Sequence, residues 1–147
     1  MPLPRITALL LLSTCMLLCL GCFGPLYVYV NFKNAIDSPI WVTSAKTGVE
    51  AKITPDHAKR FPHNAGSIIM RDESKQIFEY EHIDVGLVGS QYYYTSSSLI
   101  SFKESITLNL VIERDKRLYV LKRNETKPSD LHQPKDYPKI PIAAFGY

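Results

Sequence analysis

In the stretch SITLNLVIE, residues 105–113, every second residue is apolar: Ile106, Leu108, Leu110 and Ile112. Thr107, Asn109 and Glu113 lie on the other side of such a strand. A period of two is typical of a β-strand with one buried face. The run RLYVLK, residues 117–122, follows after the charged turn RDK. The two runs therefore predict a β-hairpin.

Similar runs occur along most of the chain, separated by turn-forming residues. They are LYVYVNFK (26–33), PIWVTS (39–44), VEAKIT (49–54), SIIMR (67–71), QIFEYEHI (76–83) and QYYYTSSSLISF (91–102). Together these runs predict an all-β fold of about eight short strands, either a single small antiparallel β-sandwich (Ig-like) or a barrel. The sheets should be mainly antiparallel, because the connections are too short to hold crossover helices. PDHAKR, residues 55–60, is the best candidate for a short helical turn.

The composition indicates one globular domain and excludes some classes of partner. The chain has 147 residues, of which 46% are hydrophobic and 21% charged. This balance is typical of a folded domain rather than a disordered chain. A net charge of +3 is too small for a dedicated nucleic-acid binder, so no nucleic-acid partner is expected.

The first 22 residues have the layout of a secretory signal. A short start with Arg5 as its only charge is followed by an uncharged apolar run, residues 6–20, and then by Gly21 and Cys22. The tetrapeptide Cys19-Leu20-Gly21-Cys22 resembles the lipobox of bacterial lipoproteins, in which a small residue precedes an invariant cysteine.

This resemblance implies cleavage between Gly21 and Cys22 and a lipid on the new N-terminal Cys22, including a thioether-linked diacylglycerol. It also implies attachment to a cell membrane. Phe23 in place of an Asp favours the outer membrane, facing the periplasm, with the cell surface as an alternative location. The competing interpretation is an uncleaved anchor formed by residues 6–30.

These observations divide the chain into four parts. Residues 1–21 are expected to be a signal peptide, 22–25 a lipidated lead, and 26–123 the β-domain. Residues 124–147 contain Pro128, Pro134, Pro138 and Pro141, which favour an extended path. The apolar end of this segment, IPIAAFGY, is expected to dock on the domain.

Enzyme signatures are missing from the sequence. All three cysteines lie within the first 22 residues, and the chain has neither a Gly-x-Ser-x-Gly turn nor a phosphate-binding glycine loop. The expectation is a non-catalytic protein without a cofactor.

Two groups of residues are candidates for binding. His57, His63 and His82 could supply a metal site if their loops converged, although their spacing matches no metal motif and solvated loop histidines are the favoured interpretation. Exposed tyrosines among Tyr92, Tyr93 and Tyr94, together with Trp41, could form a ligand platform. The alternative is that the tyrosines are ordinary strand residues and that Trp41 packs in the core.

The predicted hairpin of residues 105–122 and the residues just after it are rich in cations. They are Arg114, Lys116, Arg117, Lys122, Arg123 and Lys127. Such a patch could contact anionic lipid, or its lysines could protect a sheet edge, which is the favoured interpretation.

The sequence as a whole predicts a membrane-anchored envelope lipoprotein with a binding or structural β-domain and a protein or glycan partner. A carbohydrate-binding module and a metal-binding periplasmic protein are the two alternatives.

Overall fold

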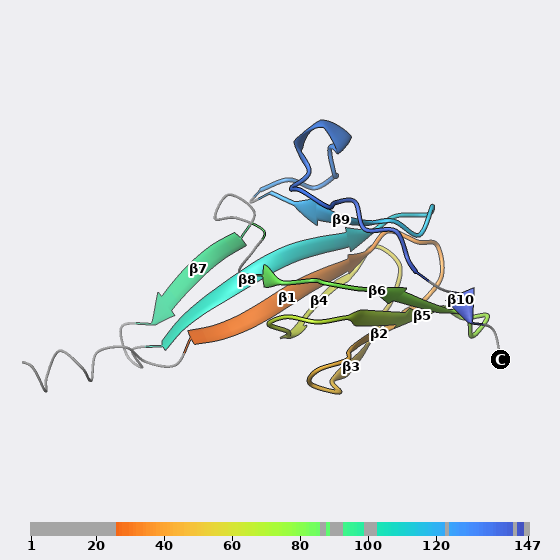
Figure 1. Ribbon diagram of the computed structural model, residues 1–147, viewed down its shortest axis with the longest axis horizontal. Helices are drawn as coiled ribbons and strands as arrows, with labels where there is room; N and C mark the ends of the chain where they lie inside the picture. Colours follow the sequence, from red (N-terminus) through yellow and green to blue (C-terminus); the bar gives the residue numbers. More distant parts are fainter. Residues whose placement is uncertain are drawn as a thin grey trace, which may run out of the picture.

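The chain folds into two β-sheets that pack face to face (Figure 1). The computed structural model describes residues 26–85, 88, 93–98, 103–122, 124–142 and 144–145. The first sheet contains β1 (Leu26–Asn34), β4 (Ala58–Pro62), β7 (Tyr93–Ser98), β8 (Lys103–Ile112) and β9 (Leu118–Leu121). The second contains β2 (Ile40–Ser44), β3 (Glu50–Ile53), β5 (Ile68–Arg71), β6 (Ile77–Tyr80) and β10 (Ala144–Phe145). The prediction of an all-β sandwich is confirmed.

The strand order places β1 and β8 at the centre of the first sheet. This sheet runs β4-β1-β8-β7, and β9 pairs with the second half of β8. The second sheet runs β10-β6-β5-β2-β3. Each of the eight strand runs expected from the sequence overlaps a strand of the structure.

The pairing of β1 with β8 is parallel, whereas the other strand pairings are antiparallel. Figure 1 shows the two strands side by side and pointing the same way. Parallel strands need a long connection, which was the reason to expect antiparallel sheets. Here the connection consists of β2, β3, β5 and β6 of the second sheet together with β4 and β7, so no crossover helix is required.

Residues 58–60 belong to a strand, so the expected helical turn over 55–60 is wrong there. These residues lie in β4, which pairs antiparallel with β1. Phe61 is the buried residue of β4, with 3% of its surface exposed. Burial of this one large side chain and the backbone pairing with β1 outweigh the local preference for a turn.

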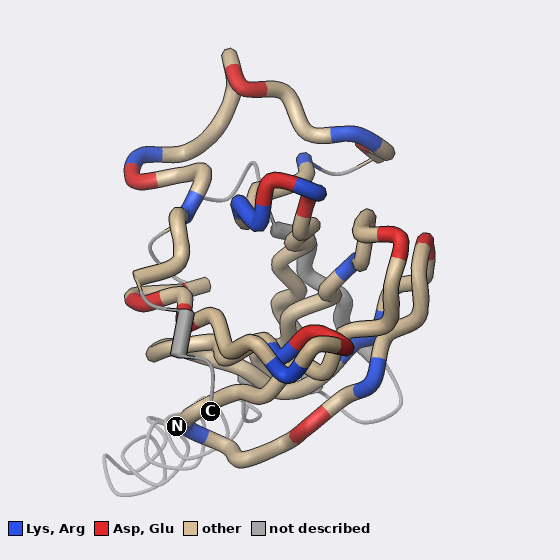
Figure 2. The backbone as a smooth tube through the Cα atoms, turned by 90° about the vertical axis from the view of Figure 1, so that its right-hand side faces the viewer, with Lys and Arg blue, Asp and Glu red and all other residues tan. Residues whose placement is uncertain are grey.

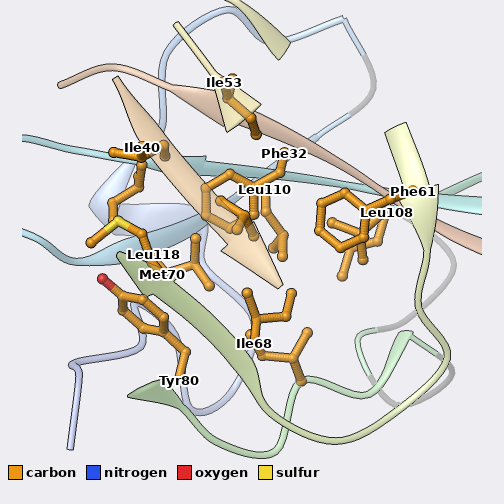
Figure 3. Packing of buried hydrophobic residues seen from close by; sticks show 14 of the residues in the cluster. Phe32, Ile40, Ile53, Phe61, Ile68, Met70, Tyr80, Leu108, Leu110 and Leu118 are labelled. Atoms are coloured by element: carbon orange, nitrogen blue, oxygen red, sulfur yellow. The ribbon is translucent and has the colours of Figure 1, made fainter. Parts of the chain in front are cut away.

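The core lies between the inner faces of the sheets (Figure 3). Figure 3 shows Phe32, Phe61, Leu108 and Leu110 of the first sheet pointing toward Ile40, Ile53, Ile68, Met70 and Tyr80 of the second. The apolar residues of each alternating run thus point into this core, and the residues between them point to the outer face of the sheet. Ile106, Leu108, Leu110 and Ile112 lie on the inner side, and the last three are fully buried. Val111 lies on the opposite side of β8, where it packs with Tyr119 and Leu121 in a second, smaller cluster.

The C-terminal segment crosses from one sheet to the other. Gln133 uses its side chain to bond both backbone groups of Val120, at 2.8 Å and 3.0 Å. Lys139 exchanges two backbone hydrogen bonds with Leu118, and β10 then pairs with β6 in the second sheet. We call residues 133–142 with 144–145 the clasp, because they join the edge of β9 to the edge of β6.

Within the part of the chain that the structure describes, no helix is long and apolar enough to cross a membrane. Residues 26–30 form the first half of β1. The competing interpretation of residues 6–30 as one helical anchor therefore fails over its last five residues.

Candidate functional site

His63 is buried and held on both sides by hydrogen bonds. Its Nδ1 lies 2.9 Å from Ser44 Oγ, and its Nε2 lies 3.0 Å from the carbonyl oxygen of Ile83. A carbonyl can only accept, so Nε2 carries the proton and Nδ1 accepts from the Ser44 hydroxyl. Burial lowers the pKa of His63, opposed in part by the Ile83 carbonyl and the Asp84 carboxylate. His63 is thus a neutral, structural histidine.

The other two candidate histidines lie on the surface. The exposed ring of His57 contacts the carbonyl oxygen of Pro55 at 2.8 Å, and His82 lies 3.7 Å from Glu81. Among the residues described, no three His, Cys, Asp or Glu side chains come together as metal ligands would. The structure does not assemble His57, His63 and His82 into one site.

Trp41 projects from the outer face of the second sheet rather than into the core. It is half-buried, with the Lys52 ammonium 5.1 Å and the Arg71 guanidinium 4.7 Å from its ring centre. Both cations are its cross-strand neighbours, on β3 and β5. The indole ring therefore already makes two cation–π contacts.

Tyr93 and Tyr94 lie on β7, which belongs to the first sheet. Their partners in register are Leu108 and Thr107. Tyr92 lies outside the described residues, as do Cys19, Leu20, Gly21 and Cys22 of the lipobox-like motif. Because Trp41 and β7 are in different sheets, the structure does not place Trp41 and these tyrosines on one platform.

A different surface gathers polar and aromatic side chains. It is the outer face of the first sheet, and we call it the tyrosine–asparagine face: Tyr27, Tyr29, Asn31, Arg60, Ser105 and Asn109. None of the described outward positions of β1, β4, β8 and β9 is Asp or Glu. The outer face of the second sheet, by contrast, carries Glu50 and Glu79.

Hydrogen bonds and a cation–π contact order this face. The Arg60 guanidinium stacks over the Tyr29 ring at 3.9 Å and donates to Ser105 Oγ at 3.3 Å. One row along the sheet, Asn31 Nδ2 donates to Asn109 Oδ1 at 3.0 Å. The polar groups are thus held in place before any ligand arrives, which lowers the entropy lost on binding.

Thr107 lies between Ser105 and Asn109 on β8 and is fully buried. Its Oγ1 has no hydrogen-bond partner in the described part of the chain. A buried hydroxyl without a partner destabilises the fold by about 1–3 kcal/mol. Thr107 therefore lowers the stability of the domain at a position in the middle of the face.

A groove lies at the end of the face where β1 finishes. It consists of two neighbouring pockets of about 220 Å³ and 550 Å³ between the sheet and residues 124–128. Lys33 lines both pockets and donates to the carbonyl oxygen of Thr126 at 3.4 Å. Asn31 and Asn109 lie in the wall of the smaller pocket, so the groove continues the tyrosine–asparagine face.

Three cations of the basic hairpin form ion pairs. Arg114 lies 2.8 Å from Asp37, Lys116 lies 3.8 Å from Asp72, and Arg117 lies 3.5 Å from Asp115. Figure 2, viewed from the right-hand side of Figure 1, shows Lys and Arg interleaved with Asp and Glu. The clasp, rather than the lysines, covers the edge of β9.

Sequence reasoning missed Asn31, Arg60 and Asn109. The first and last occupy polar positions in clearly alternating runs, but nothing in the sequence places residue 31 beside residue 109. Comparison of the chain with protein-family models, with curated proteins and with solved structures gives no match.

Proposed function

We propose that this protein is a lipid-anchored lipoprotein of the bacterial cell envelope whose β-sandwich binds a partner through the tyrosine–asparagine face, without catalysis. The observation that carries the proposal is the short distance in sequence between Cys22 and the first strand. Three residues separate Cys22 from Leu26, where β1 begins. That link spans at most about 14 Å.

Such a link would hold one end of the sandwich close to the lipid headgroups. This is the end where β1 and β8 both begin, because the two strands are parallel. The hairpin after β8 would then lie about 30 Å farther out, the length of this ten-residue strand. The ion-paired hairpin would thus point away from the membrane, and the tyrosine–asparagine face would extend between the two ends.

The composition of the face supports a binding role. Tyr and Arg are enriched in the centres of protein interfaces, and charged carboxylates are depleted there. Tyr, Ser and Asn also dominate binding loops in which rigid aromatic area is combined with adaptable hydrogen bonds. A metal-binding role has no comparable support, because His63 already uses both ring nitrogens.

The anchor is tested by the intact mass of the mature protein and by palmitate labelling. Wild type should begin at Cys22 and carry lipid, and Cys22→Ala should lose both the label and the cleavage. Cys19→Leu is the matched control and should keep both. Unlabelled wild-type protein that retains residues 1–21 would overturn the proposed anchoring.

The binding face is tested by crosslinking in cells. Asn31→Asp places a carboxylate on the face, and it should reduce the yield of the crosslinked envelope partner. Thr43→Asp, on the outer face of the second sheet, should leave that yield unchanged. Equal yields from wild type and from both variants would exclude this face as the contact surface.

A further inference from the structure

We infer that Arg60, Asn31 and Asn109, with the smaller pocket beside them, form a binding site for a glycan. This inference rests on the proposed use of the tyrosine–asparagine face and names its ligand class. The three residues lie in one row across β4, β1 and β8, because Asn31 pairs in register with both Arg60 and Asn109. Adjacent strands are about 4.8 Å apart, so Asn31 and Asn109 present closely spaced amides. The Arg60 side chain extends along the face from this row, with its guanidinium over Tyr29 and bonded to Ser105.

The amide pair leaves one donor and one acceptor for a ligand. Asn31 Nδ2 and Asn109 Oδ1 bond each other, which leaves Asn109 Nδ2 and Asn31 Oδ1 without partners among the described residues. Exchanging the two amide orientations would still leave one donor group and one acceptor. A sugar hydroxyl donates and accepts at the same time, and it therefore matches this pair of groups.

The pocket beside the pair combines apolar and polar walls. Ala58 and Leu121 supply apolar surface, and Asn124 and Thr126 supply polar groups. A pyranose ring has the same division, with C–H groups on its faces and hydroxyls at its edge. The volume of about 220 Å³ is below the roughly 300–1,000 Å³ of pockets for drug-sized ligands, which suits a single ring at the end of a chain.

The cations around this row would allow the site to bind negatively charged sugars as well as neutral ones. Lys33 and Lys122 line the pocket together with the amide pair, and Arg60 is the neighbour of Asn31 in register on β4. The one carboxylate in the pocket wall, Glu125, accepts a hydrogen bond from the backbone N–H of Lys122 at 3.1 Å. Tyr27 lies farther along β1 on the same face, and its ring would extend the contact to a further sugar ring.

The test uses the full chain, purified from membranes in detergent. The probes are soluble peptidoglycan fragments and, separately, core oligosaccharides of lipopolysaccharide, with binding measured by calorimetry. Wild type should bind at least one of the two probe classes, which also identifies the source of the glycan. Asn109→Asp keeps the acceptor for Asn31 and turns the outward donor into an acceptor. It should weaken binding about tenfold at unchanged stability.

Asn64→Asp makes the same change of charge in an exposed loop after β4 and should bind like wild type. The inference is overturned if wild type binds neither class of probe, or if Asn109→Asp and Asn64→Asp bind alike. Neither result overturns the proposed function if two other observations hold. Cys22 must carry lipid, and Asn31→Asp must still reduce the yield of a crosslinked protein partner. If Cys22 carries no lipid but the protein still binds glycan, the proposed anchoring fails and the glycan site stands.

Discussion

The clasp should depend on the side-chain amide of Gln133, and replacing Gln133 by Glu tests this with a change of very few atoms. In the native chain Nε2 donates to the carbonyl oxygens of Val120 and Ser129, at 3.0 Å and 3.2 Å. Oε1 accepts from the backbone N–H of Val120 at 2.8 Å. The side chain thus pairs with the edge of β9 as another strand would.

A glutamate at position 133 keeps the acceptor and loses the donors. Two hydrogen bonds at about 1 kcal/mol each are removed, so the free energy of unfolding should fall by about 2 kcal/mol at pH 7. Protonation of the new carboxyl restores one donor. The loss relative to wild type should therefore shrink to about 1 kcal/mol near pH 4.

The assay is urea unfolding of wild type and Gln133→Glu at both pH values, with hydrogen exchange of the Val120 amide. Exchange at Val120 should be faster in the variant at pH 7 than in wild type. Gln76→Glu, at an exposed position, is the control and should change stability by less than about 0.5 kcal/mol. A variant as stable as wild type at pH 7, or an equal loss at both pH values, would refute the role given to this amide.

Three further outcomes follow from buried residues. The pKa of His63 is lowered in the folded state, so the unfolded chain binds more protons, and stability should fall as pH drops below about 6.5. Urea unfolding at pH 7.5 and 5.5 should show a smaller decrease for His63→Gln than for wild type, whereas His57→Gln should keep it. Thr107→Val removes the buried hydroxyl and should raise the unfolding free energy by about 1 kcal/mol in thermal melts, and a decrease would mean that the hydroxyl has a partner. Phe61→Ala should cost about 3–5 kcal/mol and speed hydrogen exchange in β4, and unchanged exchange there would contradict the anchoring of β4 through this ring.

Most strands could be predicted because one face of each meets the core. Alternation in residues 26–33 and 105–113 comes directly from inner and outer positions of β1 and β8. β4 escaped prediction because Phe61 is its one buried residue, and a single apolar position shows no period. β10 has two residues, too few for any pattern.

The candidate site was much harder to predict, since it depends on register between distant strands. Asn31 and Asn109 are 78 positions apart, and a shift of one residue would turn one of them into the core. The sequence around His63 likewise gives no sign of its burial, whereas the fold places it against Ser44 and Ile83. Periodicity reports which face a residue occupies, but it carries no information about the neighbour across the sheet.

The parallel pairing of β1 with β8 also sets the order in which the chain can fold as it emerges. A chain is synthesised from its N-terminus, so β1 emerges before the other strands. This strand meets β4 only after residue 58 and β8 only after residue 103. Until then its apolar face and its backbone edge have no permanent cover, a state prone to aggregation. The first strand to appear is thus among the last to be fully paired, and its second edge stays open until about three-quarters of the chain has been synthesised.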